Sequence, residues 1–248
     1  MKARKWVSLG MMAGLSTYIV LGSATPAAAM HIAEGFLPVQ WAIVWWIVAL
    51  PFFVWGVRSL NRIVRTHPEL KLLLALAGAF TFVLSALKLP SVTGSCSHPT
   101  GIGLGTILFG PATMTVLGAL VLLFQAILLA HGGLTTLGAN MVSMAIVGAF
   151  ASYFIYQLLI KTGKQRFAIF AAAAIGDLLT YITTAIQLAL AFPAANGGFM
   201  ASFFKFASIF AVTQVPLAIS EGLLTVLVWN WLQSYGQQEL QLLDELKS

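Results

Sequence analysis

The sequence predicts an all-α membrane protein: a polytopic bundle of about seven transmembrane helices that follows a cleaved signal peptide. Two features of the composition carry this prediction. Of the 248 residues, 59% are hydrophobic and only 8% are charged, whereas soluble globular domains have about 25% charged residues. The apolar residues also gather in runs of about 18 or more, the length that an α-helix needs to cross a bilayer. The class of soluble globular proteins is therefore excluded.

The first 29 residues have the pattern of a bacterial secretory signal. A basic start precedes an apolar stretch from Trp6 to Gly22, and the sequence AAA at 27–29 forms a small-residue cleavage site. We therefore expect a signal peptide at 1–29 and a mature membrane domain at 30–248. Cleavage would make Met30 the amino terminus and His31 the second residue. The alternative is an uncleaved first transmembrane helix.

Six apolar segments after the signal are long enough to span a membrane. They cover about Gln40–Val57, Leu72–Leu89, Pro111–Ala130, Asn140–Ile160, Phe167–Phe192 and Phe206–Leu232. Two loops between them are basic, RSLNRIVRTHPELK at 58–71 and KTGKQR at 161–166. Basic loops belong in the cytoplasm. The six segments alone would put these two loops on opposite sides of the membrane, so one crossing is missing.

The segment PTGIGLGTILFG (Pro99 to Gly110) is the candidate for the missing crossing. It is too short to span a hydrocarbon core of about 30 Å as a regular helix that rises about 1.5 Å per residue. Its glycines favour a short or broken segment, which is tolerated at membrane depth only when it is buried in protein or lines a cavity. The count becomes seven spans in a bacterial inner membrane, with the amino terminus outside and the carboxyl terminus in the cytoplasm.

This topology places His31, His98 and His131 on the outer side and His67 in a cytoplasmic loop. A free Met30-His31 start offers an α-amine, a deprotonated amide nitrogen and an imidazole, which can chelate one metal ion through fused rings. His98 lies in a Gly/Pro-rich loop, and we expect its imidazole to supply the fourth nitrogen. Four nitrogens in a plane suit Ni(II) or Cu(II) and are accessible to Co(II), whereas Ca(II) and Mg(II) prefer oxygen.

Other polar residues have open alternatives. His131 is an additional ligand, a hydrogen-bond donor to a ligand, or a histidine that only ends a helix. Glu34 hydrogen-bonds the new amine or His31, or caps a short helix. Cys96 is the one cysteine, which excludes an internal disulfide, and a free thiol is a poor ligand in an oxidising compartment. Asp177 and Glu221 lie inside apolar spans, where an ionisable group indicates either a function or a structural network.

Five motifs in order resemble the CbiM family. They are MHIAEGFLP, LKLPSVTGSCSHPTGIGLG, AHGGLTTLGANMVSMAIVG, GDLLTYITTAIQLALA and QVPLAISEGLL. Members of this family are cobalt-specific substrate-binding subunits of energy-coupling-factor transporters, and the related NikM subunits handle nickel. The resemblance implies a seven-helix bundle in which Met30, His31 and His98 hold the metal. Family members begin directly at Met-His-Ile, so here proteolysis must create that terminus.

The resemblance also implies partners: cytoplasmic ATPase subunits similar to CbiO, a transmembrane coupling subunit similar to CbiQ and a small accessory membrane subunit similar to CbiN. The transported substrate would be Co(II), delivered for cobalamin biosynthesis, with no catalytic cofactor. Ni(II) is the alternative, because the same four nitrogens suit both ions. The residues of the motifs resemble CbiM more than NikM, which favours cobalt.

The chain lacks the G-x-x-x-x-G-K-[ST] phosphate loop, so we expect a transporter subunit that depends on an ATP-hydrolysing partner. An intramembrane metalloenzyme is disfavoured because no H-E-x-x-H motif is present. A passive metal channel is disfavoured because conduction requires weak or multiple sites, and a chelating terminus binds tightly.

Overall fold

The computed structural model describes residues 31–90 and 96–247, so the predicted signal peptide and Met30 lie outside the described residues. Nearly all regular structure in the described part is helical, which confirms the predicted fold class. In chain order the elements are α2 (Val39–Thr66), η1 (Pro68–Leu70), α3 (Lys71–Ala86), β1 (Leu89–Pro90), β2 (Cys96–Ser97), α4 (Ile102–Phe109), α5 (Pro111–Leu129), α6 (Leu137–Asn140), η3 (Met141–Gly148), α7 (Ala149–Ile160), α8 (Gln165–Ala191), α9 (Gly198–Tyr235) and α10 (Gln237–Lys247).

Six helical stretches in the described residues are long and apolar enough to cross a membrane. They are Val39–Thr66, Pro68–Ala86, Pro111–Leu129, Leu137–Ile160, Gln165–Ala191 and Gly198–Tyr235. Each contains or overlaps one of the apolar segments expected from the sequence. Large apolar side chains such as Ile47, Leu72 and Leu227 are exposed on their outer faces. Such an apolar surface is stable in contact with the lipid tails of a membrane.

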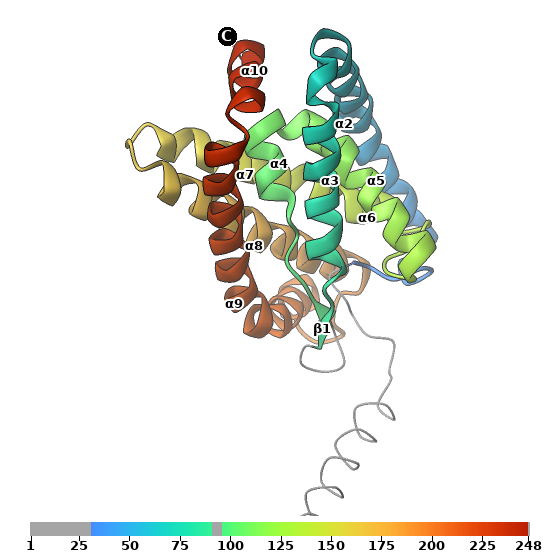
Figure 1. Ribbon diagram of the computed structural model, residues 1–248. Coiled ribbons are helices and arrows are strands. Elements are labelled where there is room, and N and C mark those ends of the chain that lie inside the picture. The colour runs from blue at the N-terminus through green and yellow to red at the C-terminus, as the bar shows by residue number, and fades with distance from the viewer. Residues whose placement is uncertain (1–30, 91–95, 248) are drawn as a thin grey trace, which may run out of the picture.

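The short segment between the second and third of these stretches forms α4, which is buried along its whole length. It contacts α3, α5, α7 and α8 and lies among them at the centre of the bundle (Figure 1). A Cβ atom at Gly103 would lie 2.8 Å from the Cα atom of Ala173 in α8. Glycine at this position therefore allows α4 and α8 to pack in direct backbone contact.

The loops gather at two opposite ends of the bundle. The strand β1 lies at one end, and α10 lies at the other end together with the turn between α2 and α3 (Figure 1). At the β1 end, β1 and β2 form a short antiparallel ladder that pairs Leu89 with Ser97. One hydrophobic core includes Ile32, Leu137 and Leu188, and a second core includes Leu70 and Leu104.

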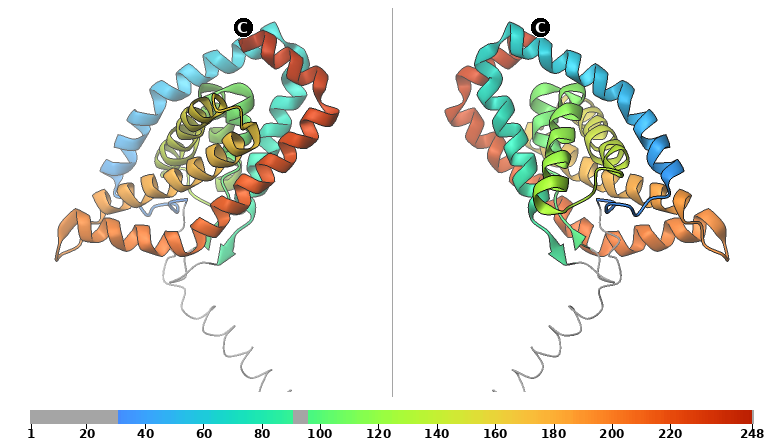
Figure 2. Two further views of the ribbon diagram at one scale, coloured as in Figure 1. Left: turned by 90° about the vertical axis from the view of Figure 1, so that its left-hand side faces the viewer. Right: turned by 90° about the vertical axis from the view of Figure 1, so that its right-hand side faces the viewer.

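Among the described residues, one helical stretch contains a π-helical turn and another is bent. The stretch from Leu137 to Ile160 contains a π-helical turn, η3, whose Ala145 carbonyl accepts a hydrogen bond from the Thr115 hydroxyl of α5 at 3.1 Å. Helix α9 contains Pro216 and bends along its length (Figure 2). Proline removes a backbone donor and is a frequent cause of such bends.

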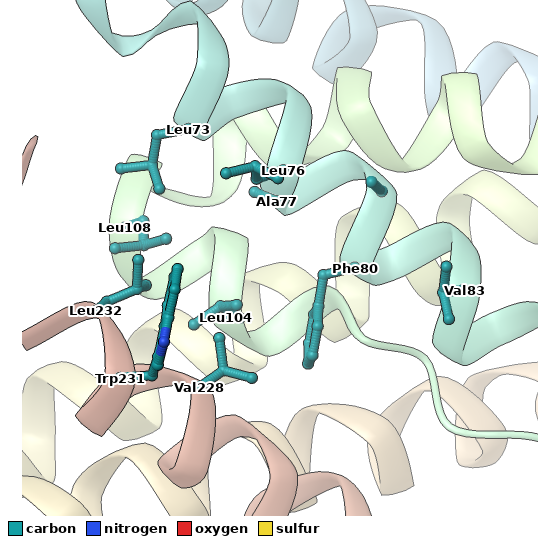
Figure 3. Close-up of a pocket in the computed structure, with 11 residues that line it drawn as sticks. Leu73, Leu76, Ala77, Phe80, Val83, Leu104, Leu108, Val228, Trp231 and Leu232 are labelled. Carbon is teal, nitrogen blue, oxygen red and sulfur yellow. The ribbon is translucent and has the colours of Figure 1, made fainter. Parts of the chain in front are cut away.

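An apolar groove of about 360 Å³ opens between α3, α4 and α9 (Figure 3). Its lining includes Phe80, Val83 and Trp231. No histidine, carboxylate or thiol belongs to this lining, so the groove has no ligands for a metal ion. The group of potential metal ligands lies elsewhere, near the β1 end of the bundle.

Candidate metal centre

Three of the four histidines meet in one buried cluster. His31 precedes α2, His98 lies between β2 and α4, and His131 follows α5. The Nε2 atom of His98 lies 2.8 Å from Nδ1 of His31 and 3.0 Å from Nε2 of His131. All three side chains are at least 96% buried, since their exposed fractions are 2%, 0% and 4%. The fourth histidine, His67, ends α2 and lies outside the cluster.

The spacing of these nitrogens fits neighbouring ligands of one metal ion. Metal–imidazole bonds are about 2.0 Å long, so two ligands at a right angle lie about 2.8 Å apart. The separations of 2.8 and 3.0 Å match this value. In the described residues, these histidines are the one group of three or more His, Cys, Asp or Glu side chains whose ligand atoms lie within 4.8 Å of one another.

A hydrogen bond from His98 to the backbone directs its other ring nitrogen toward His31 and His131. Nδ1 of His98 lies 2.9 Å from the carbonyl oxygen of Pro99. Its N–H donates to that oxygen, which leaves the lone pair of Nε2 facing the other histidines. His31 turns Nδ1 into the cluster, and this nitrogen can share a metal with the amide nitrogen of the same residue in a six-membered chelate ring.

The surroundings keep the imidazoles neutral, which is the form that binds metal. Burial lowers the pKa of His98 to about 4 and the pKa of His131 to about 3. Burial also lowers the pKa of His31 well below its usual value, and His131 and His98 add to that effect. Protons therefore do not compete for these nitrogens at neutral pH.

The segment from Gly132 to Asn140 binds the amino-terminal segment through hydrogen bonds, and we call it the seat. The backbone N–H of Ile32 donates to Oδ1 of Asn140 at 2.8 Å, and the Thr136 hydroxyl donates to the Ile32 carbonyl at 2.6 Å. The N–H of Glu34 donates to the carbonyl of Gly132 at 3.2 Å. These bonds fix the backbone immediately after His31, and so they fix its imidazole.

Two glycines make this seat possible. Gly132 has a φ of +77°, a conformation that favours glycine. A Cβ atom at Gly133 would lie 2.4 Å from the Cα atom of Glu34. Any side chain at this position would displace the amino-terminal segment.

Glu34 lies on the exposed side of the same contact. Its carboxylate accepts the backbone N–H of Thr135 at 3.2 Å, and the N–H of Gly35 donates to the Thr135 hydroxyl at 3.1 Å. The hydrogen bonds from Thr135 lower the pKa of the Glu34 carboxyl. The structure thus places Glu34 as an anchor of the amino-terminal segment, outside the histidine cluster.

The loop that carries His98 is held by polar groups of α8 and α9. The hydroxyl of Tyr181 accepts the N–H of His98 at 3.0 Å and donates to its carbonyl at 2.9 Å. Gln214 donates to the same carbonyl at 3.3 Å and also hydrogen-bonds the carboxylate of Asp177. The carboxylate of Glu221 accepts the hydroxyl of Thr100 at 2.9 Å. Asp177 and Glu221 therefore belong to one structural network around this loop.

Sequence reasoning did not single out Tyr181, Gln214, Asn140 or Thr100. The available signal was a polar residue inside or beside an apolar span, where an unpaired polar group is costly. Cys96 lies in β2, and its half-buried thiol is not a member of the histidine cluster. Burial raises the pKa of this thiol, which favours the protonated form.

A multi-pass helical membrane bundle with a buried cluster of imidazole nitrogens defines a class: membrane proteins that handle a transition-metal ion. The chain belongs to the CbiM family, because residues 31–239 match the family model described as the cobalt uptake substrate-specific transmembrane region. Proteins similar to it include a cobalt transport protein of a Nostoc species, with 74% identity over 97% of this chain and 93% of the relative. A cobalt transport protein of Moorella thermoacetica is 63% identical over 92% of this chain and 89% of the relative.

Two solved structures have a similar fold. A truncated transition metal transporter has a TM-score of 0.72 and 26% identity, and the match covers 83% of this chain and 99% of that one. A second transition metal transporter also has a TM-score of 0.72, with 25% identity over 82% of this chain and 92% of that chain. The chain is a membrane component of a cobalt transporter, and the expectation that it is not an enzyme is confirmed by the names of its relatives.

Proposed function

We propose that the chain is the substrate-binding subunit of an ATP-driven energy-coupling-factor importer that captures Co(II) at the outer face of the membrane. The observation that supports this proposal is the convergence of three buried imidazole nitrogens, two of them 2.8 and 3.0 Å from Nε2 of His98. A buried site with preset nitrogen ligands binds a transition metal tightly and rejects Ca(II) and Mg(II). The imported cobalt would supply cobalamin biosynthesis.

The proposed ligand set begins at a terminus made by proteolysis after residue 29. The amine of Met30, the amide nitrogen and Nδ1 of His31, and Nε2 of His98 supply four nitrogens. We assign His131 the role of an additional ligand, because its Nε2 faces the same atom of His98. The seat formed by Thr136 and Asn140 would present the terminus to the metal.

The proposed orientation puts the histidine end outside and the carboxyl terminus in the cytoplasm. Arg58, Arg62 and Arg65 lie in the last three turns of α2, which ends at the same end of the bundle as α10 (Figure 1). Positive residues at that end favour a cytoplasmic location. The metal centre, near the opposite end, would then be reached from outside.

Partners are required because the chain has no phosphate loop of its own. We propose CbiO-like ATPases, a CbiQ-like coupling subunit and a CbiN-like accessory subunit. Movement of the bundle driven by these partners would release the metal inward. Ni(II) remains the alternative substrate, since separations that match right-angled ligands suit the planar geometry that Ni(II) favours.

The first test is Co(II) binding by the purified protein and its His98→Ala variant, measured by titration calorimetry. Loss of the central nitrogen is expected to abolish high-affinity binding while leaving membrane insertion intact. His67→Ala is the matched control, because His67 lies outside the cluster. High-affinity binding that survives in His98→Ala would refute the ligand assignment.

A further inference from the structure

Helix α9 reaches the loop of His98 through two buried polar side chains. Gln214 and Glu221 have exposed fractions of 1% and 0%. They are seven residues apart, about two helical turns, and so they project from the same face of α9. Gln214 donates to the carbonyl of His98 at 3.3 Å, and Glu221 receives hydrogen bonds from Thr100.

Both carboxylate oxygens of Glu221 accept hydrogen bonds from Thr100. One carboxylate oxygen accepts the backbone N–H of Thr100 at 2.5 Å, and the other accepts its hydroxyl at 2.9 Å. The structure shows no basic side chain paired with Glu221 in the residues that it describes. A carboxyl group is costly inside a membrane span, and here its partners are groups of this one loop. The hydrogen bonds of Glu221 therefore hold this loop in place.

We call the two hydrogen bonds between Glu221 and Thr100 the clamp. A single residue links Thr100 to the imidazole of His98. Pro99 lies between them, and its ring fixes the backbone φ angle. The carbonyl of Pro99 accepts the Nδ1–H of His98 at 2.9 Å. A shift of Thr100 would move this carbonyl and turn the ring of His98. The Nε2 atom would then lose its place opposite His31 and His131.

We propose that Glu221 is a positioning residue for the metal centre, which fixes the imidazole of His98 through Thr100 and Pro99. This inference rests on the proposed function and deepens it. Pro216 lies between Gln214 and Glu221, in the helix that Figure 2 shows to be bent. A change in the bend of α9 moves the two anchors relative to each other and so distorts the metal site.

The experiment compares Thr100→Val, Glu221→Met and the double variant with the unmodified protein. Co(II) affinity is measured by titration, and the visible absorption of bound Co(II) reports the geometry of its ligands. Each single variant is expected to bind Co(II) about tenfold more weakly, the size of effect seen when a group that orients a metal ligand is removed. The absorption bands are expected to shift as well. The double variant should lose no more than Glu221→Met alone, because Glu221→Met already removes both hydrogen bonds with Thr100 and Thr100→Val removes only the one from the hydroxyl.

Thr225→Val is the matched control. Thr225 lies one turn beyond Glu221 on α9, is fully buried, and donates only within its own helix, to the carbonyl of Glu221 at 2.8 Å. It should keep the affinity and the spectrum. Thr100→Ser retains the hydroxyl and is expected to restore binding, which separates the hydrogen bond from a general loss of folding.

Three results would overturn the inference. One is unchanged affinity and spectrum in Thr100→Val and Glu221→Met. The second is an equal loss in Thr225→Val, which would indicate a packing effect along α9. The third is additive losses in the double variant, which would show that the two residues act separately. Failure of the unmodified protein to bind Co(II) would be a different result, because it would contradict the proposed function itself.

Discussion

At the scale of single residues, the proposed function depends on the cluster of His31, His98 and His131. The four histidines and the loop positions of these three were available from the sequence. Their distances were not, because they are set by contacts between residues far apart in the chain, such as Ile32 with Asn140. Likewise, a tyrosine or glutamine in an apolar span gives no sign of which loop it faces. Tyr181 and Gln214 could therefore not be assigned to His98 in advance.

The number of protons released on binding tests the chelating terminus. The pKa values of His98 and His131, about 4 and 3, lie far below neutral pH, so these imidazoles are neutral at pH 7 and release no proton when they bind the metal. The amine of Met30 and the amide of His31 do release protons, and we expect about two protons per Co(II) bound. Calorimetric titration in buffers of different ionisation enthalpy gives this number. Binding without proton release would indicate a site made of imidazoles alone.

The seat for the amino-terminal segment can be tested at Gly133. A Cβ atom there would lie 2.4 Å from the Cα atom of Glu34, so Gly133→Ala should push the segment and His31 away. Overpacking of this kind costs about 1–3 kcal/mol, and we expect Co(II) affinity to fall by about tenfold or more. Gly78→Ala is the control, since a Cβ atom at Gly78 meets nothing within 4 Å. Equal affinity in Gly133→Ala and the control would show that the seat does not hold the ligand.

At the scale of elements, the sequence predicts the long helices well because a span of apolar residues has one stable form in lipid. It also predicts α4, since the positions of the basic loops required another crossing. It does not predict the β1–β2 ladder or the π-helical turn η3. Two-residue strands have no periodicity, and a π-helix has the same composition as an α-helix. Helix α10 is short and charged, so its sequence lacks the apolar run that indicates a membrane span.

The packing of α4 gives a prediction about stability. Gly103→Val places a branched side chain where a Cβ atom already lies 2.8 Å from the backbone of α8. We expect the variant to lose about 1–3 kcal/mol of stability against unfolding, measured as a lower midpoint of thermal unfolding in detergent. Gly78→Val on α3 serves as the control, where space is open. A stable Gly103→Val variant would contradict the direct contact between α4 and α8.

At the scale of the whole molecule, the structure joins two requirements of a metal-uptake subunit. The bundle presents an apolar exterior to lipid, and it encloses a nitrogen-rich site near the end opposite its basic turn (Figure 1). Composition and charge predict both the exterior and the two ends. Residues 1–30 lie outside the described part of the chain, so cleavage after residue 29 stays a prediction. In the proposed ligand set, a free amine at Met30 would complete the chelate that begins at Nδ1 and the amide nitrogen of His31.

The most direct measurement is the intact mass of the purified membrane protein under native conditions, with Co(II) and Ni(II) offered in competition. We expect a chain that begins at Met30 and carries one cobalt ion. A chain that retains residues 1–29 would keep the nitrogen of Met30 in a peptide bond, and the proposed chelate would then be wrong. A processed chain that carries nickel instead would leave the site intact and contradict the assignment of cobalt.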